Sequence, residues 1–138
     1  MGESSSTIFV LQDGNTNYVT VPIIKSPCCI KVKVNGKEFN ALVSTVTPRS
    51  VCSLSVLERL NVGMNKEEMT TIDAPMGQTL DAIGQVELTM LIKNAEIHES
   101  FYVTKKLVED FIIGMDIILK FGGFELNNNS FGQTLTLG

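Results

Sequence analysis

Apolar and polar positions alternate along much of this chain, which is the pattern of β-strands that bury one face. The alternation is strict in Ile30–Val34, and the pair Asn35-Gly36 follows it directly. This pair is the most typical sequence of a two-residue hairpin turn. Phe39–Val43 then provides a returning strand. The pattern therefore predicts a hairpin over residues 30–43 that ends at Ser44.

Other segments with β-strand character follow along the chain, separated by residues that favour turns. One helix is expected over Ser53–Leu60, because its leucines have helical spacing and Ser53 suits the N-cap. Residues 1–138 are interpreted as a single all-β domain, with residues 1–6 as a flexible N-terminal segment. The further predicted strands are Thr7–Leu11, Tyr18–Ile24, Lys66–Asp73, Thr79–Asn94, Glu99–Val103, Phe111–Ile113, Gly122–Leu126 and Thr134–Leu137.

Composition excludes several classes of function. The net charge is -4 and the only basic doublet is Lys105–Lys106, which argues against direct binding of nucleic acid. No apolar run approaches the roughly 20 residues of a membrane span, and no N-terminal signal sequence is recognisable. The three cysteines indicate a reducing compartment, so we expect an intracellular protein, cytoplasmic or nuclear.

The residues that bind metals in proteins are sparse and poorly spaced here. Cys28 and Cys29 are adjacent, without the two-residue separation of a zinc knuckle. The single histidine, His98, has no candidate ligand near it in the sequence. We therefore expect no metal site and no cofactor, and interpret the thiols as buried residues of strands.

The segment Ala41–Ser53, with the sequence ALVSTVTPRSVCS, resembles the active-site loop of retroviral-type aspartic proteases. In that family a strand ends in Asp-Thr/Ser-Gly-Ala. Laid on this motif, Ser44 stands at the position of the catalytic aspartate and Thr45 keeps the family hydroxyl. Val46 replaces the glycine and Thr47 replaces the alanine. The site is therefore a degenerate version of the family motif.

A second likeness lies in the apolar residues Ile112 and Ile113 followed by Gly114, after which the family has a short helix, here Met115–Lys120. The hairpin tip after Lys66–Asp73 resembles the protease flap, and its residues are Asp73, Ala74, Pro75, Met76, Gly77 and Gln78. The order of motifs over residues 23–138 is similar to the protease domains of the DNA-damage-inducible ubiquitin-shuttle family and of domesticated retrotransposons. The resemblance implies a retropepsin-like half barrel, closed or partly open, with a flap and one or two short helices.

Family members often tie the active-site loop to the C-terminal helix through an acid–base pair. The resemblance implies that Arg49 and Asp116 make this tie here, although two solvated side chains would satisfy the sequence equally well.

An aspartic protease requires two carboxylates about 3 Å apart that share a proton and activate water. Ser44 supplies no carboxylate, and the loop holds no His or Lys to activate its hydroxyl. Asp73, Asp81 and Asp116 all lie outside the loop. We therefore predict that the chain is not an enzyme but a pseudoprotease.

The resemblance implies a two-fold homodimer, which would make the domain a dimerisation and protein-interaction module. The strands at Thr7–Leu11 and Thr134–Leu137 are expected to pair across the two-fold axis, because nothing in them blunts an exposed edge. The alternatives are an endopeptidase active only with a partner subunit, a peptide-binding adaptor that uses the flap-covered cleft, and a monomer whose ends fold back on its own sheet. The residues expected at the dimer interface are Ile8, Val10, Thr45, Leu135 and Leu137.

Overall fold

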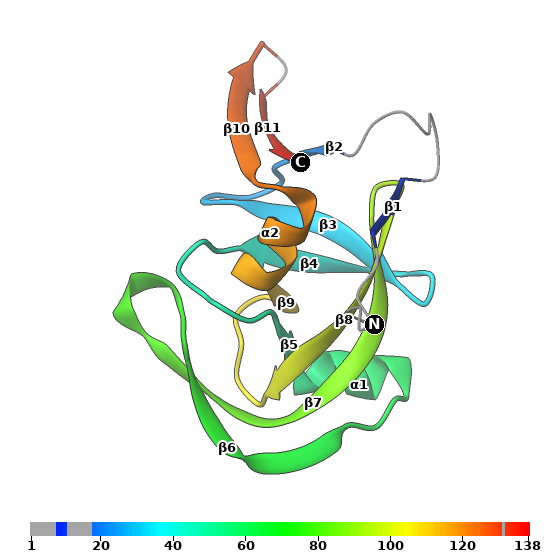
Figure 1. Ribbon diagram of the computed structural model, residues 1–138, viewed down its shortest axis with the longest axis vertical. Helices are drawn as coiled ribbons and strands as arrows, with labels where there is room; N and C mark the ends of the chain where they lie inside the picture. The colour runs from blue at the N-terminus through cyan, green and yellow to red at the C-terminus, as the bar shows by residue number, and fades with distance from the viewer. Residues whose placement is uncertain (1–7, 11–17, 131) are drawn as a thin grey trace.

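Strands dominate the computed structural model, and two short helices interrupt them (Figure 1). The structure describes residues 8–10, 18–130 and 132–138, so the expected flexible segment 1–6 lies outside the described residues. No helix in these ranges is long and apolar enough to cross a membrane. The elements are β1 (Ile8–Val10), β2 (Val19–Pro22), β3 (Cys29–Val34), β4 (Lys37–Val43), β5 (Val51–Ser53), α1 (Leu54–Leu60), β6 (Asn65–Asp73), a 3-10 turn (Pro75–Gly77), β7 (Thr79–Ile92), β8 (Ala95–Thr104), β9 (Phe111–Ile113), α2 (Met115–Phe121), β10 (Phe124–Asn129) and β11 (Gly132–Leu137).

Six of the described strands close into a barrel. The sheet runs in the order β1-β8-β5-β9-β4-β3-β7-β6, and an additional pairing of β7 with β8 closes the ring, leaving β1 and β6 attached to it. The predicted β3–β4 hairpin is confirmed, with Val34 opposite Lys37. Asn35 and Gly36 have φ angles of 54° and 78°, the left-handed conformation that this turn requires. The all-β prediction is thus confirmed.

Strand β9 lies between β4 and β5 and places the loop at residues 44–50 over the barrel. It runs parallel to β4, with Val43 opposite Ile113, and antiparallel to β5, with Val51 opposite Ile112. The sequence pattern did not predict β5, which is only three residues long. The chain passes directly from β5 into α1, where the Ser53 side chain accepts a hydrogen bond from the Ser55 N–H at 3.2 Å. The predicted helix and its cap are confirmed.

The main core fills the barrel and extends under α2. Phe111 of β9 makes edge-to-face contacts with Phe39 and Phe101, at ring-centroid distances of 5.7 and 5.3 Å. Ile117 and Ile118 of α2 are fully buried against the same cluster. Each such side chain contributes about 1.5–3 kcal/mol through burial. This core supports the strands that flank the loop at residues 44–50.

The C-terminal strand was expected to have an unpaired edge, and the structure shows that it does not. β11 has β10 on one side and β2 on the other, so both of its edges are satisfied within the chain. Leu135 and Leu137 are 0% exposed and belong to the main core. The prediction that these two leucines face a second copy is therefore wrong, because their side chains are already covered by their own chain. Figure 1 shows the β10–β11 hairpin projecting from the barrel beyond α2.

The N-terminal strand β1 also pairs within its own chain. It runs antiparallel to β8, with Ile8 opposite Ile97 and Val10 opposite Ala95. The dimer prediction assumed that this N-terminal strand is unpaired within its own chain. Residues 8–10 are instead paired with β8 along one edge. The side chains of Ile8 and Val10 lie outside what the structure describes, so their expected place in an interface stays a prediction.

The three cysteines are free and buried, as expected. Cys29 and Cys52 lie in strands β3 and β5, whereas Cys28 lies in the turn directly before β3. Burial, with a smaller contribution from the Asp110 carboxylate, raises the pKa of Cys52 to about 12. Burial also raises the pKa of Cys28 and Cys29. The thiols are therefore protonated and unreactive at neutral pH.

Candidate functional site

The loop between β4 and β5 turns the hydroxyl groups of Ser44 and Thr47 inward. The Ser44 N–H donates to the Ile113 carbonyl at 2.9 Å, and the Ser44 and Thr47 hydroxyls share a hydrogen bond of 2.8 Å. Ser44 is 5% exposed and Thr47 is 0% exposed. The Ser44 hydroxyl is thus hydrogen-bonded to another neutral hydroxyl, that of Thr47. A neutral hydroxyl in this setting cannot serve as a general base.

The apex of the same loop faces outward. Thr45 and Pro48 are exposed, and the Val46 side chain is 57% exposed. Val46 therefore does not fill a groove of its own chain. The loop instead presents a small apolar side chain and a hydroxyl at the surface.

Gly114 allows α2 to approach the loop closely, as the packing motif predicts. A Cβ atom at Gly114 would lie 2.5 Å from the Thr47 carbonyl oxygen, which no side chain tolerates without movement. The absence of a side chain lets the Met115 N–H donate to that carbonyl at 2.8 Å. Ile112 and Ile113, which precede the glycine, are 3% and 0% exposed. Close backbone contact thus joins the loop to the start of α2.

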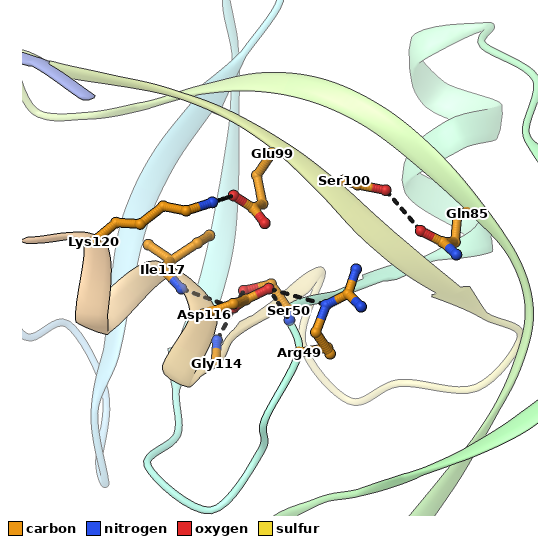
Figure 2. A network of polar contacts seen from close by, with 9 residues as sticks. All are labelled: Arg49, Ser50, Gln85, Glu99, Ser100, Gly114, Asp116, Ile117 and Lys120. Atoms are coloured by element: carbon orange, nitrogen blue, oxygen red, sulfur yellow. Dashed lines mark hydrogen bonds and ion pairs between the residues drawn. The ribbon is translucent and has the colours of Figure 1, made fainter. Parts of the chain in front are cut away.

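Asp116 makes a second connection between α2 and the loop (Figure 2). Its carboxylate accepts hydrogen bonds from the Ser50 N–H at 3.0 Å and the Ser50 hydroxyl at 2.7 Å. The Ser50 oxygen in turn accepts from the Gly114 N–H at 2.9 Å. Sequence reasoning did not identify Ser50, because its burial and its contact with Asp116 are visible only in the folded chain.

Arg49 joins the tie from its outer side, as the resemblance implied. Its Nε lies 3.6 Å from an Asp116 carboxylate oxygen, and its guanidinium lies 4.8 Å from the Tyr102 ring centroid. The Arg49 side chain is 40% exposed, against 13% for Asp116. Solvent therefore weakens the ion pair, and the buried hydrogen bonds of Ser50 hold the loop more strongly.

A third contact fixes the far end of α2 to the barrel. Lys120, in the last turn, forms an ion pair with Glu99 of β8, which is 8% exposed (Figure 2). On the opposite face of the sheet, the Ser100 hydroxyl donates to the Gln85 side-chain oxygen at 2.8 Å. Helix α2 is thus anchored at both ends, and its first turn is hydrogen-bonded to the loop at residues 44–50.

Strands β6 and β7 form the predicted long hairpin, with Asp73 opposite Thr79. At its tip the Ala74 N–H donates to the Gln78 carbonyl at 2.9 Å. Met76 and Gly77 have φ angles of 66° and 72°. The left-handed conformation of Met76 is unusual for a residue with a side chain, and that side chain is 92% exposed. The hairpin at residues 73–78 is confirmed, and its role as a mobile cover remains a prediction.

A cavity of about 840 Å³ lies between this hairpin tip and the segment at residues 105–109. Leu42 of β4 and Ile112 of β9 form its floor, two positions before Ser44 and Gly114 respectively. Residues 44–48 are not among the residues that line it. The cavity is therefore beside the loop at residues 44–50 rather than directly over it.

The carboxylates outside the loop do not gather near Ser44. Asp73 and Asp81 are exposed on the β6–β7 hairpin, and Asp116 is engaged by Ser50. Within the described ranges, no three His, Cys, Asp or Glu side chains lie close enough together to hold a metal ion.

No protein-family model matches this sequence, and a comparison with curated proteins finds no match. Solved structures do match. A retropepsin-like aspartic protease from Rickettsia conorii is 14% identical, with a TM-score of 0.61, covering 99% of this chain and 96% of that one. The retroviral protease-like domain of Ddi1 from Leishmania major is 16% identical, with a TM-score of 0.53 and coverage of 75% and 81%. The EIAV protease, complexed with the inhibitor HBY-793, is 26% identical, with a TM-score of 0.57 and coverage of 76% and 96%. The fold of this chain is retropepsin-like.

Proposed function

We propose that this retropepsin-like chain is a non-catalytic domain that pairs with a second copy of itself and serves as a protein-interaction module. The observation that carries the proposal is Ser44, which stands where the protease motif has its aspartate and shares its hydrogen bond with Thr47. The fold, with its anchored loop and long hairpin, is retained without the carboxylate. What remains is a scaffold for binding.

Chemistry supports the loss of catalysis. The aspartic mechanism needs two carboxylates that share one proton, and a neutral hydroxyl cannot take the place of either. A partner subunit with its own aspartate would bring only one carboxylate to a site shared with Ser44. Val46 and Thr47 change the loop further, because the family has glycine and alanine at these positions. We therefore propose that neither the chain alone nor such a mixed dimer cleaves peptides.

The dimer surface that we propose is the free edge of β10, in place of the buried β11. β10 is the outer strand of the described three-stranded sheet. Phe124 and Leu126 lie opposite Leu137 and Leu135, so they share one face of the sheet with these two buried leucines. Phe124 is 43% exposed and Leu126 is 54% exposed. The apolar face thus continues past the core to an unpaired edge, which a second copy would cover.

Thr45 is a second residue that we propose for the dimer interface. Its side chain is exposed at the loop apex, where a second loop could meet it across a two-fold axis. Hydrogen bonds between such hydroxyls need no carboxylate. The tie of α2 to the loop keeps this apex in a fixed position for pairing.

Light scattering at micromolar concentration tests the dimer. We expect a mass twice the 15.1 kDa of one chain, and we expect Phe124→Lys with Leu126→Lys to reduce it to one chain. Leu119→Lys is the matched control, because Leu119 is 65% exposed but lies on α2. A monomer in the unchanged protein would overturn the proposed pairing.

Incubation with a peptide library from about pH 4 to 7, followed by mass spectrometry, tests the absence of catalysis. We expect no products, and we expect Ser44→Asp alone to remain inactive because Val46 and Thr47 still alter the loop. The stricter variant combines Ser44→Asp with Val46→Gly and Thr47→Ala. Turnover by the unchanged protein that a statine-type inhibitor blocks would refute a non-catalytic role.

Peptide binding in the cavity beside the loop is a second candidate activity of the same domain. The supporting observation is the cavity of about 840 Å³ beneath the β6–β7 tip, which is large enough for side chains of an extended peptide. The two activities are compatible, since the cavity and the β10 edge are formed by different residues.

A further inference from the structure

The two sides of the cavity mouth carry the most exposed large apolar side chains that the structure describes. Met76, at the hairpin tip, is 92% exposed, and Val108, in the opposite segment, is 95% exposed. Both line the cavity, whose interior also includes Leu80 and Leu107. A cavity with an apolar interior and apolar rims on both sides favours a ligand with a large apolar side chain.

Some of the charged side chains around this cavity are paired with each other, and others are free to contact a ligand. Lys25 and Glu109 form an ion pair of 2.7 Å, and Glu109 is only 9% exposed, so these two charges compensate each other. Lys105 and Lys106 are exposed, and no ion pair engages either of them within the described residues. The basic doublet of the sequence is thus the available positive charge at the cavity mouth.

The doublet also connects the cavity to a neighbouring depression. Lys105 and Lys106 line both the main cavity and a second one of about 390 Å³, and Leu80 is common to the two. Among the described residues, Asp81 is the one acidic residue that lines the second cavity. A ligand that extends from the first cavity into the second therefore lies beside the two lysines, which line both, while Glu109 of the first cavity is already paired with Lys25.

We propose that the cavity binds an extended peptide whose large apolar side chain enters it and whose neighbouring acidic residue contacts Lys105 and Lys106. This inference rests on the proposed function of a non-catalytic interaction domain and specifies the chemistry of its peptide. The hydrophobic effect supplies most of the affinity, while the lysines select peptides that carry a carboxylate at the adjacent position. A doublet of lysines is too small a basic surface to favour nucleic acid instead.

Fluorescence anisotropy with short labelled peptides tests the proposal. One probe has a leucine followed by two aspartates in an alanine–serine sequence, and a second has the aspartates before the leucine, so that either chain direction is sampled. Replacing the aspartates of the tighter probe with asparagines should weaken binding about fivefold, since exposed ion pairs are individually modest. Replacing its leucine with alanine should weaken binding about tenfold or more.

The protein variant Lys105→Gln with Lys106→Gln should remove the preference for aspartate over asparagine and leave the preference for leucine. Lys31→Gln with Lys33→Gln is the matched control, because this exposed lysine pair lies on β3 and does not line the cavity. Circular dichroism checks that both variants are folded. Loss of the aspartate preference in the control as well would assign it to net charge and overturn the proposal.

Equal binding of the aspartate and asparagine peptides, or no binding of either probe to the unchanged protein, would also overturn the proposal. These results are independent of the tests of the proposed function. The inference can fail while the mass remains that of a dimer and no products form. The proposed function fails if products appear or the mass is that of one chain, even where the peptides bind as expected.

Discussion

The tie between α2 and the 44–50 loop leads to a quantitative prediction for Asp116→Ala. The carboxylate accepts two hydrogen bonds from Ser50, at 3.0 and 2.7 Å, and Ser50 is 0% exposed. Hydrogen bonds to charged groups contribute about 1.5–3 kcal/mol each, and the buried Ser50 N–H would lose its acceptor. Allowing for non-additivity, we expect the free energy of unfolding to fall by about 3–4 kcal/mol. This is a large share of the stability of a typical domain.

Two further variants separate the contributions to the tie. Arg49→Ala should cost only about 1 kcal/mol, because the Arg49 side chain is 40% exposed and the ion pair distance is 3.6 Å. Ser50→Ala should cost about 1–3 kcal/mol, since it leaves the Gly114 N–H without its acceptor. If Asp116 acts through Ser50, the double variant of these two residues should lose about 1–2 kcal/mol less than the sum of the single losses.

Urea unfolding followed by circular dichroism at pH 7 measures these changes, with the slope of the transition as a check that the variants unfold in the same manner. Light scattering on the same samples reports whether the loop apex affects pairing. An Arg49→Ala loss as large as that of Asp116→Ala would refute the reasoning, because it would assign the tie to the exposed ion pair. An Asp116→Ala loss below about 1 kcal/mol would show that the hydrogen bonds are replaced by water.

The same unfolding measurements test three further predictions about stability. Gly114→Ala should destabilise by about 1–3 kcal/mol, because its Cβ would meet the Thr47 carbonyl, whereas Gly63→Ala, which meets nothing within 4 Å, should be nearly neutral; equal effects would contradict the close approach. Leu137→Ala should cost about 2–5 kcal/mol, and a loss below about 1 kcal/mol would contradict its burial. Since burial raises the pKa of Cys52 from 9.0 to about 12, its contribution to stability is complete below pH 9 and is lost as the pH rises from 9 towards 12; Cys52→Ala should make the fall of stability in that range shallower, and an unchanged fall would refute the shift.

Local patterns in the sequence determined most of the strands and the first helix. Strict alternation marked β3, and Asn35-Gly36 marked the turn after it, because a period of two and left-handed backbone angles are properties of neighbouring residues. The cap at Ser53 is local in the same sense. The serine at position 44 is a fact of the sequence itself, and its correspondence to the protease aspartate stays a prediction.

Only the tertiary structure decided which partners the chain ends and the buried polar groups have. Strand β5 is three residues long, too short for a periodic pattern, and it exists because β8 and β9 flank it. Thr134–Leu137 has the same alternation whether it pairs with a second copy or lies between β10 and β2, so sequence alone could not show that Leu135 and Leu137 are buried in their own chain. Ser50 and Asp116 are 66 positions apart, and a hydrogen bond across that separation leaves no signature in the residues adjacent to either one. Non-local pairing is set by the packing of the whole barrel, and for that reason it becomes visible only in the folded chain.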